Sequence, residues 1–130
     1  MIPSGISFQD VEIEPDIGEC VVQAINRLIS ERPNASIDIQ KVSEAVGFPG
    51  TTVKPVFYML LGLRLLKATF TPRHRTCGRM IAEQEQSAEV ILEKARNEEY
   101  WCIHCAEPIE GPQDIETQII FWKPGANVKQ

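Results

Sequence analysis

The sequence predicts an α+β protein in which three helices are followed by a β-hairpin, a fourth helix and a short C-terminal β segment. Three observations support this order. Apolar residues recur at helical spacing in three segments that precede residue 62. Short runs rich in β-branched and aromatic residues then lie between turn residues, near residues 65–81 and 117–122. A composition of 43% apolar and 24% charged residues is that of a globular protein, and 130 residues make about one domain.

The first helix is expected from about residue 17 to residue 31. Its apolar positions follow helical spacing: Ile17, Val21, Ala24, Ile25 and Leu28. Asp16 and Glu19 have the spacing of an N-terminal capping box, and Pro33 requires the helix to end before it. Cys20 falls near the apolar stripe, which favours a packing role for this thiol over metal ligation.

Two shorter helices follow the first. Asp38 is placed to cap the earlier of the two, and Gly47 is placed to end it in the left-handed conformation. The later helix contains Pro55, which is tolerated within a first helical turn. Its N-cap is therefore expected at Thr51 or Thr52.

The segment after Gly62 completes a familiar pattern. It reads "LLKATFTPRHRTCGRMI", two strands joined by a basic turn at residues 72–76. Together with "IDIQKVSEAVGFPGTTVKPVFYMLLGLRLLKATF", it resembles the winged helix-turn-helix family over residues 17–81. The resemblance implies that the third helix corresponds to the recognition helix and that "TPRHRTCGR" corresponds to the wing.

Charge is distributed unevenly along the chain, whose net charge is −5. Residues 1–44 hold eight acids and three bases, and residues 83–130 hold ten acids and four bases. Residues 45–82 hold six bases and no acid, which is typical of a nucleic-acid surface but also fits a face that docks on an acidic partner. The candidate nucleic-acid-binding residues are Thr51, Thr52, Lys54, Arg64, Arg73, Arg75 and Arg79.

The third helix reads "VFYMLLGLRLL" after Lys54, and such a helix is apolar nearly all round. Reading base edges requires exposed polar side chains. The pattern therefore favours phosphate contacts over base readout. It equally fits a protein-interaction or adaptor module, in which the third helix and the C-terminal tail form an interface and DNA is not bound.

Residues 82–99 form an acidic segment with an apolar stripe, and we expect a helix there. Such a helix would either cover the core or pair with a second copy in a homodimer. The sequence thus divides into a winged-helix domain with an N-terminal arm, residues 1–81, and residues 82–130, a helix and a cysteine-containing β segment that pack on the same core.

The cysteine motif "WCIHC" at residues 101–105 lacks the context of a redox or haem site. A thioredoxin-like active site would have most of its domain after the motif, but only 25 residues follow Cys105 here. Covalent haem attachment needs His after the second Cys, and Ala106 stands there. A structural zinc site is more natural, since two thiolates on a tight turn supply half of a tetrahedral set.

The other half of that set is expected in "HRTC", which has the same spacing. Combined, the candidate metal ligands are His74, Cys77, Cys102 and Cys105. Two alternatives stay open: free thiols, or one C-x2-C motif from each of two chains around a shared ion.

A winged helix, a following helix and a cysteine-bearing ribbon resemble the organisation of the general transcription factor E family. The resemblance is one of architecture. The expected function is that of a winged-helix nucleic-acid-binding or transcription-regulatory module, with zinc as the candidate structural ion. We do not expect an enzyme, because the sequence shows no set of a nucleophile with a general base and no glycine-rich loop that would bind phosphate. Without a secretory signal or an apolar run of spanning length, a cytoplasmic protein with no membrane partner is expected.

Overall fold

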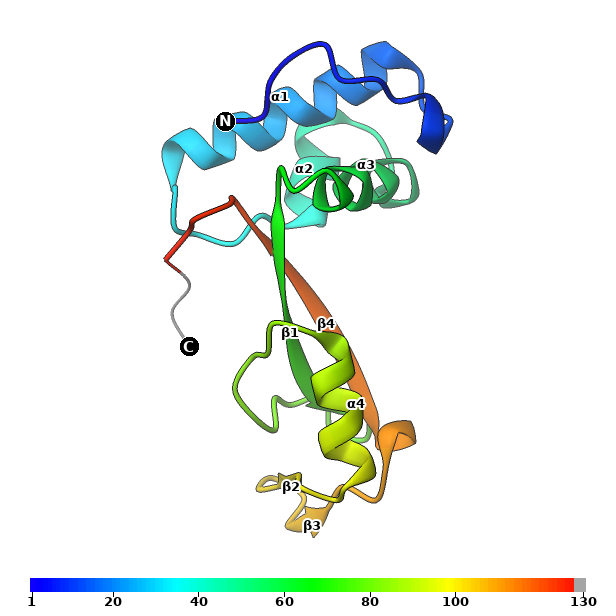
Figure 1. The fold of residues 1–130 in the computed structure, drawn as a ribbon, viewed down its shortest axis with the longest axis vertical. Coiled ribbons are helices and arrows are strands. Elements are labelled where there is room, and N and C mark those ends of the chain that lie inside the picture. The colour runs from blue at the N-terminus through cyan, green and yellow to red at the C-terminus, as the bar shows by residue number, and fades with distance from the viewer. Residues whose placement is uncertain (128–130) are drawn as a thin grey trace. The chain divides into compact units, whose positions relative to one another are not determined.

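The structure is a computed structural model and describes residues 1–127. Within this range the chain is α+β, with four α-helices and two small antiparallel sheets, which confirms the predicted class. The elements are η1 (Gln9–Val11), α1 (Pro15–Glu31), α2 (Ile39–Val46), α3 (Gly50–Gly62), β1 (Lys67–His74), α4 (Ala88–Arg96), β2 (Trp101–Cys102), β3 (Glu107–Pro108), η2 (Pro112–Asp114) and β4 (Ile115–Trp122). Figure 1 shows their course.

The chain forms two compact units. Among the described residues, unit 1 contains 1–67 and 121–127, and unit 2 contains 68–120. Strands β1 and β4 contribute residues to both units. The division differs from the boundary at residue 81 expected from the sequence, because the end of β4 joins the N-terminal helices.

Helix α1 in unit 1 begins earlier than predicted. Glu14 is its N-cap, Pro15 occupies the first helical position, and no side chain caps the helix. The predicted capping box is wrong, since Glu19 instead accepts a hydrogen bond from the backbone N–H of Gly5, 3.0 Å away. The packing role predicted for Cys20 is also wrong, because this thiol is exposed beside the buried Val21.

Helix α2 has the predicted ends. Asp38 accepts a hydrogen bond from the Gln40 N–H at 2.9 Å, and Gly47 ends the helix with φ of 76°. Helix α3 starts at Gly50, so Pro55 lies in its second turn. The prediction that Pro55 lies in the first turn is wrong. The missing N–H of Pro55 leaves the carbonyl of Thr51 without its helical donor, at a position that solvent reaches.

Helix α3 is apolar along most of its length, as predicted, and one side of it is buried. Its buried residues are Val53, Val56, Phe57 and Leu60. Thr51, Lys54 and Tyr58 are exposed and follow helical spacing, so they share the opposite face. Phe57 packs edge-on against Phe121 with ring centroids 5.0 Å apart, and this contact anchors the end of β4 in unit 1.

The main partner of β1 is β4, a strand more than forty residues away in sequence. Ile37 adds an antiparallel bridge to Phe121 of β4. The predicted hairpin within residues 65–81 exists only as a tight turn, with an isolated bridge between Arg73 and Met80. The segment after the turn thus pairs with β1 through isolated bridges and forms no regular strand, while the regular ladder of β1 is with β4. Residues 75–114 lie between β1 and β4.

Helix α4 in unit 2 is shorter than the predicted helix at residues 82–99. Ser87 caps it by accepting a hydrogen bond from the Glu89 N–H at 3.1 Å. Residues 82–87 are not helical, because Glu85 exchanges two backbone hydrogen bonds with Phe70, at 2.8 and 2.7 Å. The buried core of unit 2 consists of Ile91, Ala95, Tyr100, Cys102, Ile109 and Ile115.

Candidate metal centre and nucleic-acid surface

Two tight turns bring the four predicted metal ligands together in unit 2. His74 is the last residue of β1, and Cys77 follows in the turn after it. Cys102 ends β2, and Cys105 lies in the turn that leads to β3. The ligand atoms of all four residues lie within 4.8 Å of one another.

Two distances in this cluster match the edges of a tetrahedral zinc site. Zn–S bonds of ~2.3 Å imply edges of about 3.8 Å between two sulfurs, and slightly less between sulfur and an imidazole nitrogen. The Sγ atoms of Cys77 and Cys102 are 3.7 Å apart. The Sγ of Cys77 is also 3.7 Å from Nδ1 of His74. The donor atoms thus leave a space of the size that one such ion requires.

The two turns share a backbone conformation. Gly78 after Cys77 has φ of 72°, and Ala106 after Cys105 has φ of 52°. Both are left-handed, a region that costs a residue with Cβ about 1–2 kcal/mol. The Gly78 N–H closes the first turn by donating to the His74 carbonyl at 2.7 Å. Each half of the cluster is therefore held by the same kind of turn, although only the first has glycine at the strained position.

The thiols of the cluster differ in proton affinity. A hydrogen bond from the Arg79 backbone N–H lowers the pKa of Cys77, with hydrogen bonds from Cys102 and Cys105 acting in the same direction. Burial, together with hydrogen bonds and charge from Cys102 and Cys77, raises the pKa of Cys105 to about 12. Without a cation, three crowded sulfurs cannot all be thiolates, because each negative charge opposes the next. A bound divalent cation would offset this repulsion and release the protons.

The histidine ligand has a partner on its far side. His74 is 2% exposed, and its Nε2 lies 3.7 Å from a carboxylate oxygen of Glu107. Its Nδ1 faces the sulfurs. A carboxylate beside the second ring nitrogen orients a metal-binding imidazole and raises its basicity. Glu107 is thus placed to support ligation through Nδ1.

Arg73 and Arg75, both predicted to contact nucleic acid, make internal hydrogen bonds. Arg73 donates to Gln118 Oε1 at 2.7 Å and to the Gly78 carbonyl at 3.0 Å. Arg75 donates from its guanidinium to the carbonyls of Gln113 and Ile115, each at 3.0 Å.

Two further placements concern the same basic turn. The Arg75 backbone N–H reaches the Asp114 carbonyl at 2.8 Å, so Arg75 joins the turn to the start of β4. Arg79 is exposed, and its backbone N–H donates a hydrogen bond to the Cys77 sulfur.

The remaining nucleic-acid candidates lie in unit 1. Thr51, Lys54 and Arg64 are exposed and Thr52 is partly buried. The Lys54 ammonium lies 5.7 Å from the centroid of the Tyr58 ring, which is within the range of a cation–π contact. The structure therefore brings Thr51, Thr52 and Lys54 together at the start of α3, whereas Arg73, Arg75 and Arg79 belong to unit 2.

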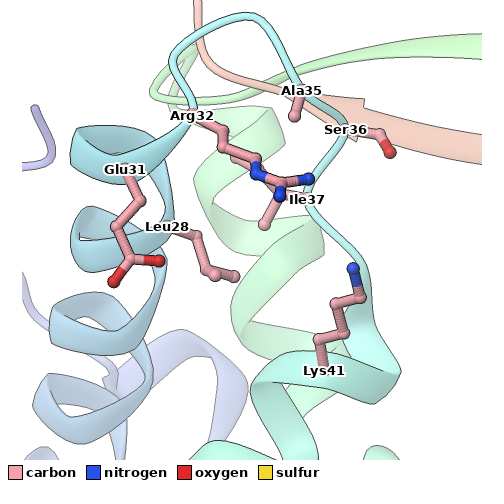
Figure 2. Close-up of a pocket in the computed structure, with 7 residues that line it drawn as sticks. All are labelled: Leu28, Glu31, Arg32, Ala35, Ser36, Ile37 and Lys41. Atoms are coloured by element: carbon pink, nitrogen blue, oxygen red, sulfur yellow. The ribbon is translucent and has the colours of Figure 1, made fainter.

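Unit 1 also has a hollow of about 360 Å³ between the end of α1 and the start of α2. It is lined by Leu28, Glu31, Arg32, Ala35, Ser36, Ile37 and Lys41. Figure 2 shows the head groups of Arg32 and Lys41 extending beside this hollow. Arg32 and Lys41 precede residues 45–82, the segment without acids, so the charge distribution along the sequence did not indicate them as binding residues.

No family model, curated protein or solved structure matches the chain. In the part of the chain that the structure describes, no helix is both long and apolar enough to cross a bilayer. Sequence reasoning missed the partner of His74 and the structural role of Arg75. Nothing in the pattern could have indicated Glu107, since its place opposite Cys102 depends on the pairing of β2 with β3.

Proposed function

We propose that this chain is a winged-helix nucleic-acid-binding module of transcription-regulatory type that carries a structural zinc ion. The observation that carries the proposal is the cluster of one imidazole and three thiols within 4.8 Å. The order of three helices followed by the paired strands β1 and β4 supports the winged-helix part. In this proposal, residues 75–114 replace the short loop of an ordinary wing.

The size of unit 2 supports a structural role for the metal. Its 53 residues, numbers 68–120, have a buried apolar core of six residues that includes the ligand Cys102. A domain this small has too little apolar burial to offset its loss of conformational entropy, and natural examples often add a metal. A closed set of four protein ligands also leaves no open position for catalysis.

Unit 1 would supply the nucleic-acid surface. The exposed face of α3 presents Thr51 and Lys54 to solvent. Arg32 and Lys41 add cations near α2, and none of these three cations forms a salt bridge among the described residues. Such side chains suit contacts to phosphate, which position a protein without reading sequence.

Metal analysis tests the first half of the proposal. Native mass spectrometry of the purified chain should show one zinc per protein, and Cys102→Ser should lose it. Cys20→Ser is the matched control, because Cys20 is exposed and outside the cluster. Fully folded, metal-free protein would refute the zinc centre.

A duplex-DNA titration across a salt series tests the second half. Binding should weaken as salt rises, and Lys54→Gln should reduce both the affinity and the slope. Lys94→Gln removes the same charge from unit 2 and should leave binding unchanged. Absence of binding at low salt, with folding intact, would overturn the nucleic-acid proposal.

A second candidate function is protein interaction through α3. Tyr58 is 42% exposed and stacks edge-on with Phe121 at 5.9 Å, so this face has aromatic as well as cationic content. Tyr58→Ala separates the candidates. If Tyr58→Ala abolishes binding of a partner protein or a second copy of the chain and leaves the affinity for duplex DNA unchanged, the protein-interaction function is favoured.

A further inference from the structure

The second cysteine turn exposes large apolar side chains. Tyr100 and Cys102 are buried, while Trp101 is 53% exposed and Ile103 is 83% exposed. Trp101 and Cys102 form β2, in which successive side chains point to opposite faces, and Ile103 follows in the turn. The side chains of Trp101 and Ile103 are therefore both open to solvent.

The strand pairing enlarges this apolar surface. Trp101 lies directly opposite Pro108 in the antiparallel pair of β2 and β3, and Pro108 is also exposed. Side chains at directly opposed positions lie on the same face of a sheet. We call the three residues Trp101, Ile103 and Pro108 the knuckle patch. Its backbone is fixed by the turn that carries Cys102 and Cys105, so the patch is presented on a constrained scaffold.

Acidic residues surround the patch in sequence. Glu98 and Glu99 precede it and Glu110 follows it, and all three are exposed. Residues 68–120 contain ten acids and five bases, whereas the rest of the chain contains eight of each. Three thiolates around one divalent ion would add further negative charge. Unit 2 therefore carries the net charge of the protein.

We propose that the knuckle patch binds a cationic segment of a partner protein that carries an apolar anchor residue. The apolar anchor would contact Trp101 and Ile103, and Lys or Arg side chains beside it would pair with the exposed acids. Arg and Lys also bind over the face of an exposed Trp. Nucleic acids and anionic membranes carry the opposite charge, so this surface would repel them. The inference goes beyond the proposed function and needs neither zinc nor DNA binding to hold.

Heteronuclear NMR of the full chain, as purified, tests the proposal with three synthetic peptides of equal length. One combines Lys and Arg with Leu, one replaces Leu with Ser, and one replaces the bases with Glu. The indole N–H resonance of Trp101 should shift with the first peptide. The buried Trp122 provides an internal reference in the same spectrum. The second and third peptides should bind at least about tenfold more weakly, because each lacks one of the two interactions.

Variants assign the binding to the patch. Trp101→Ala and Ile103→Ser should each weaken the first peptide about tenfold or more. Leu63→Ser is the matched control, since Leu63 is also 53% exposed but lies in unit 1. Glu99→Gln should weaken binding at low salt and lose its effect as salt rises.

Several outcomes would overturn the proposal. Equal binding of the acidic peptide would exclude charge recognition. Shifts at Tyr58 without shifts at Trp101 would place the interaction on α3. A Trp101 resonance that moves with protein concentration alone would identify a second copy of this chain as the occupant. Shifts at Trp101 on addition of duplex DNA would assign the patch to nucleic acid.

Discussion

The two units of this chain are stabilised by different means. Unit 1 has a conventional apolar core in which three helices bury side chains such as Ile25, Phe57 and Leu60, together with Phe121 of β4. Unit 2 has one short helix, strands of two residues and a small core that includes a thiol. Unit 1 therefore has an extensive apolar core, whereas unit 2 has a small one beside four potential metal ligands.

The units also differ in charge and in how their polar groups are used. Unit 1 is balanced, and its Lys54 and Arg64 are exposed. Unit 2 is acidic, and its Arg73 and Arg75 make hydrogen bonds within the unit. The named basic side chains are therefore open to solvent in unit 1, whereas Arg73 and Arg75 hold segments of unit 2 together by hydrogen bonds.

Metal removal should produce the largest difference between the units. We expect Cys102→Ser, or a strong chelator, to unfold unit 2 at a cost of more than about 4 kcal/mol, because metal binding is coupled to folding. Amide resonances of unit 2 should collapse while those of α1 to α3 persist. Cys20→Ser should leave both sets in place. Retention of the unit 2 resonances would show that its core is sufficient without metal.

Truncation of a core side chain in unit 1 should destabilise that unit and leave the metal content of unit 2 unchanged. Phe57→Ala removes a fully buried ring that packs on Phe121, and should lower the free energy of unfolding by about 3–5 kcal/mol. Metal stoichiometry, measured by mass spectrometry, should stay the same. Tyr58→Ala truncates the exposed neighbouring ring and should cost less than half as much in a denaturant titration. Equal costs would mean that α3 is not packed as described.

Loss of the carboxylate beside His74 should weaken metal binding without unfolding unit 2. Glu107→Gln should reduce zinc affinity by about 10–100-fold, the usual effect of removing an outer partner of a ligating histidine. Competition with a chromogenic chelator measures this change. Glu110→Gln removes an exposed acid outside the cluster and should have no such effect. Unchanged affinity in Glu107→Gln would refute a supporting role for this carboxylate.

Relief of backbone strain in the second turn should have the smallest effect. Ala106→Gly removes a Cβ from a residue with φ of 52°, so it should raise stability by about 0.5–1 kcal/mol after the added flexibility of glycine is counted. The same substitution at Ala45, in helix α2, should lower stability by about 0.5–1 kcal/mol. Thermal unfolding separates the two signs. A lower stability for Ala106→Gly would mean that this turn is not strained.

Local signals in the sequence predicted what depends on near neighbours. The cap at Asp38, the left-handed Gly47 and the end of α3 at Gly62 each follow from residue type and position. The two halves of the ligand cluster were predicted because turn spacing is itself local. Their meeting depends on tertiary structure, which the structure shows.

Long-range pairing explains the wrong predictions. Residues 82–87 have helical composition, yet Glu85 pairs with Phe70, and backbone pairing outweighs propensity there. The hairpin expected at residues 65–81 is present only through the bridge between Arg73 and Met80, while the regular ladder of β1 is with β4 from the far end of the chain. The pairing with β4 depends on packing that no short window of sequence contains.

The hydrogen bond from the Arg75 N–H to the Asp114 carbonyl, at 2.8 Å, joins the first residue after β1 to the last residue before β4. Residues 76–113 thus leave the β1–β4 pair and return to it at nearly the same place. Changes in length that spare the contacts of this segment with β1, such as the Glu85–Phe70 pair, should therefore leave both strands in place. In protein engineering terms, the segment is an insertion in a β-hairpin, and it carries three of the four candidate ligands while His74 stays in the strand.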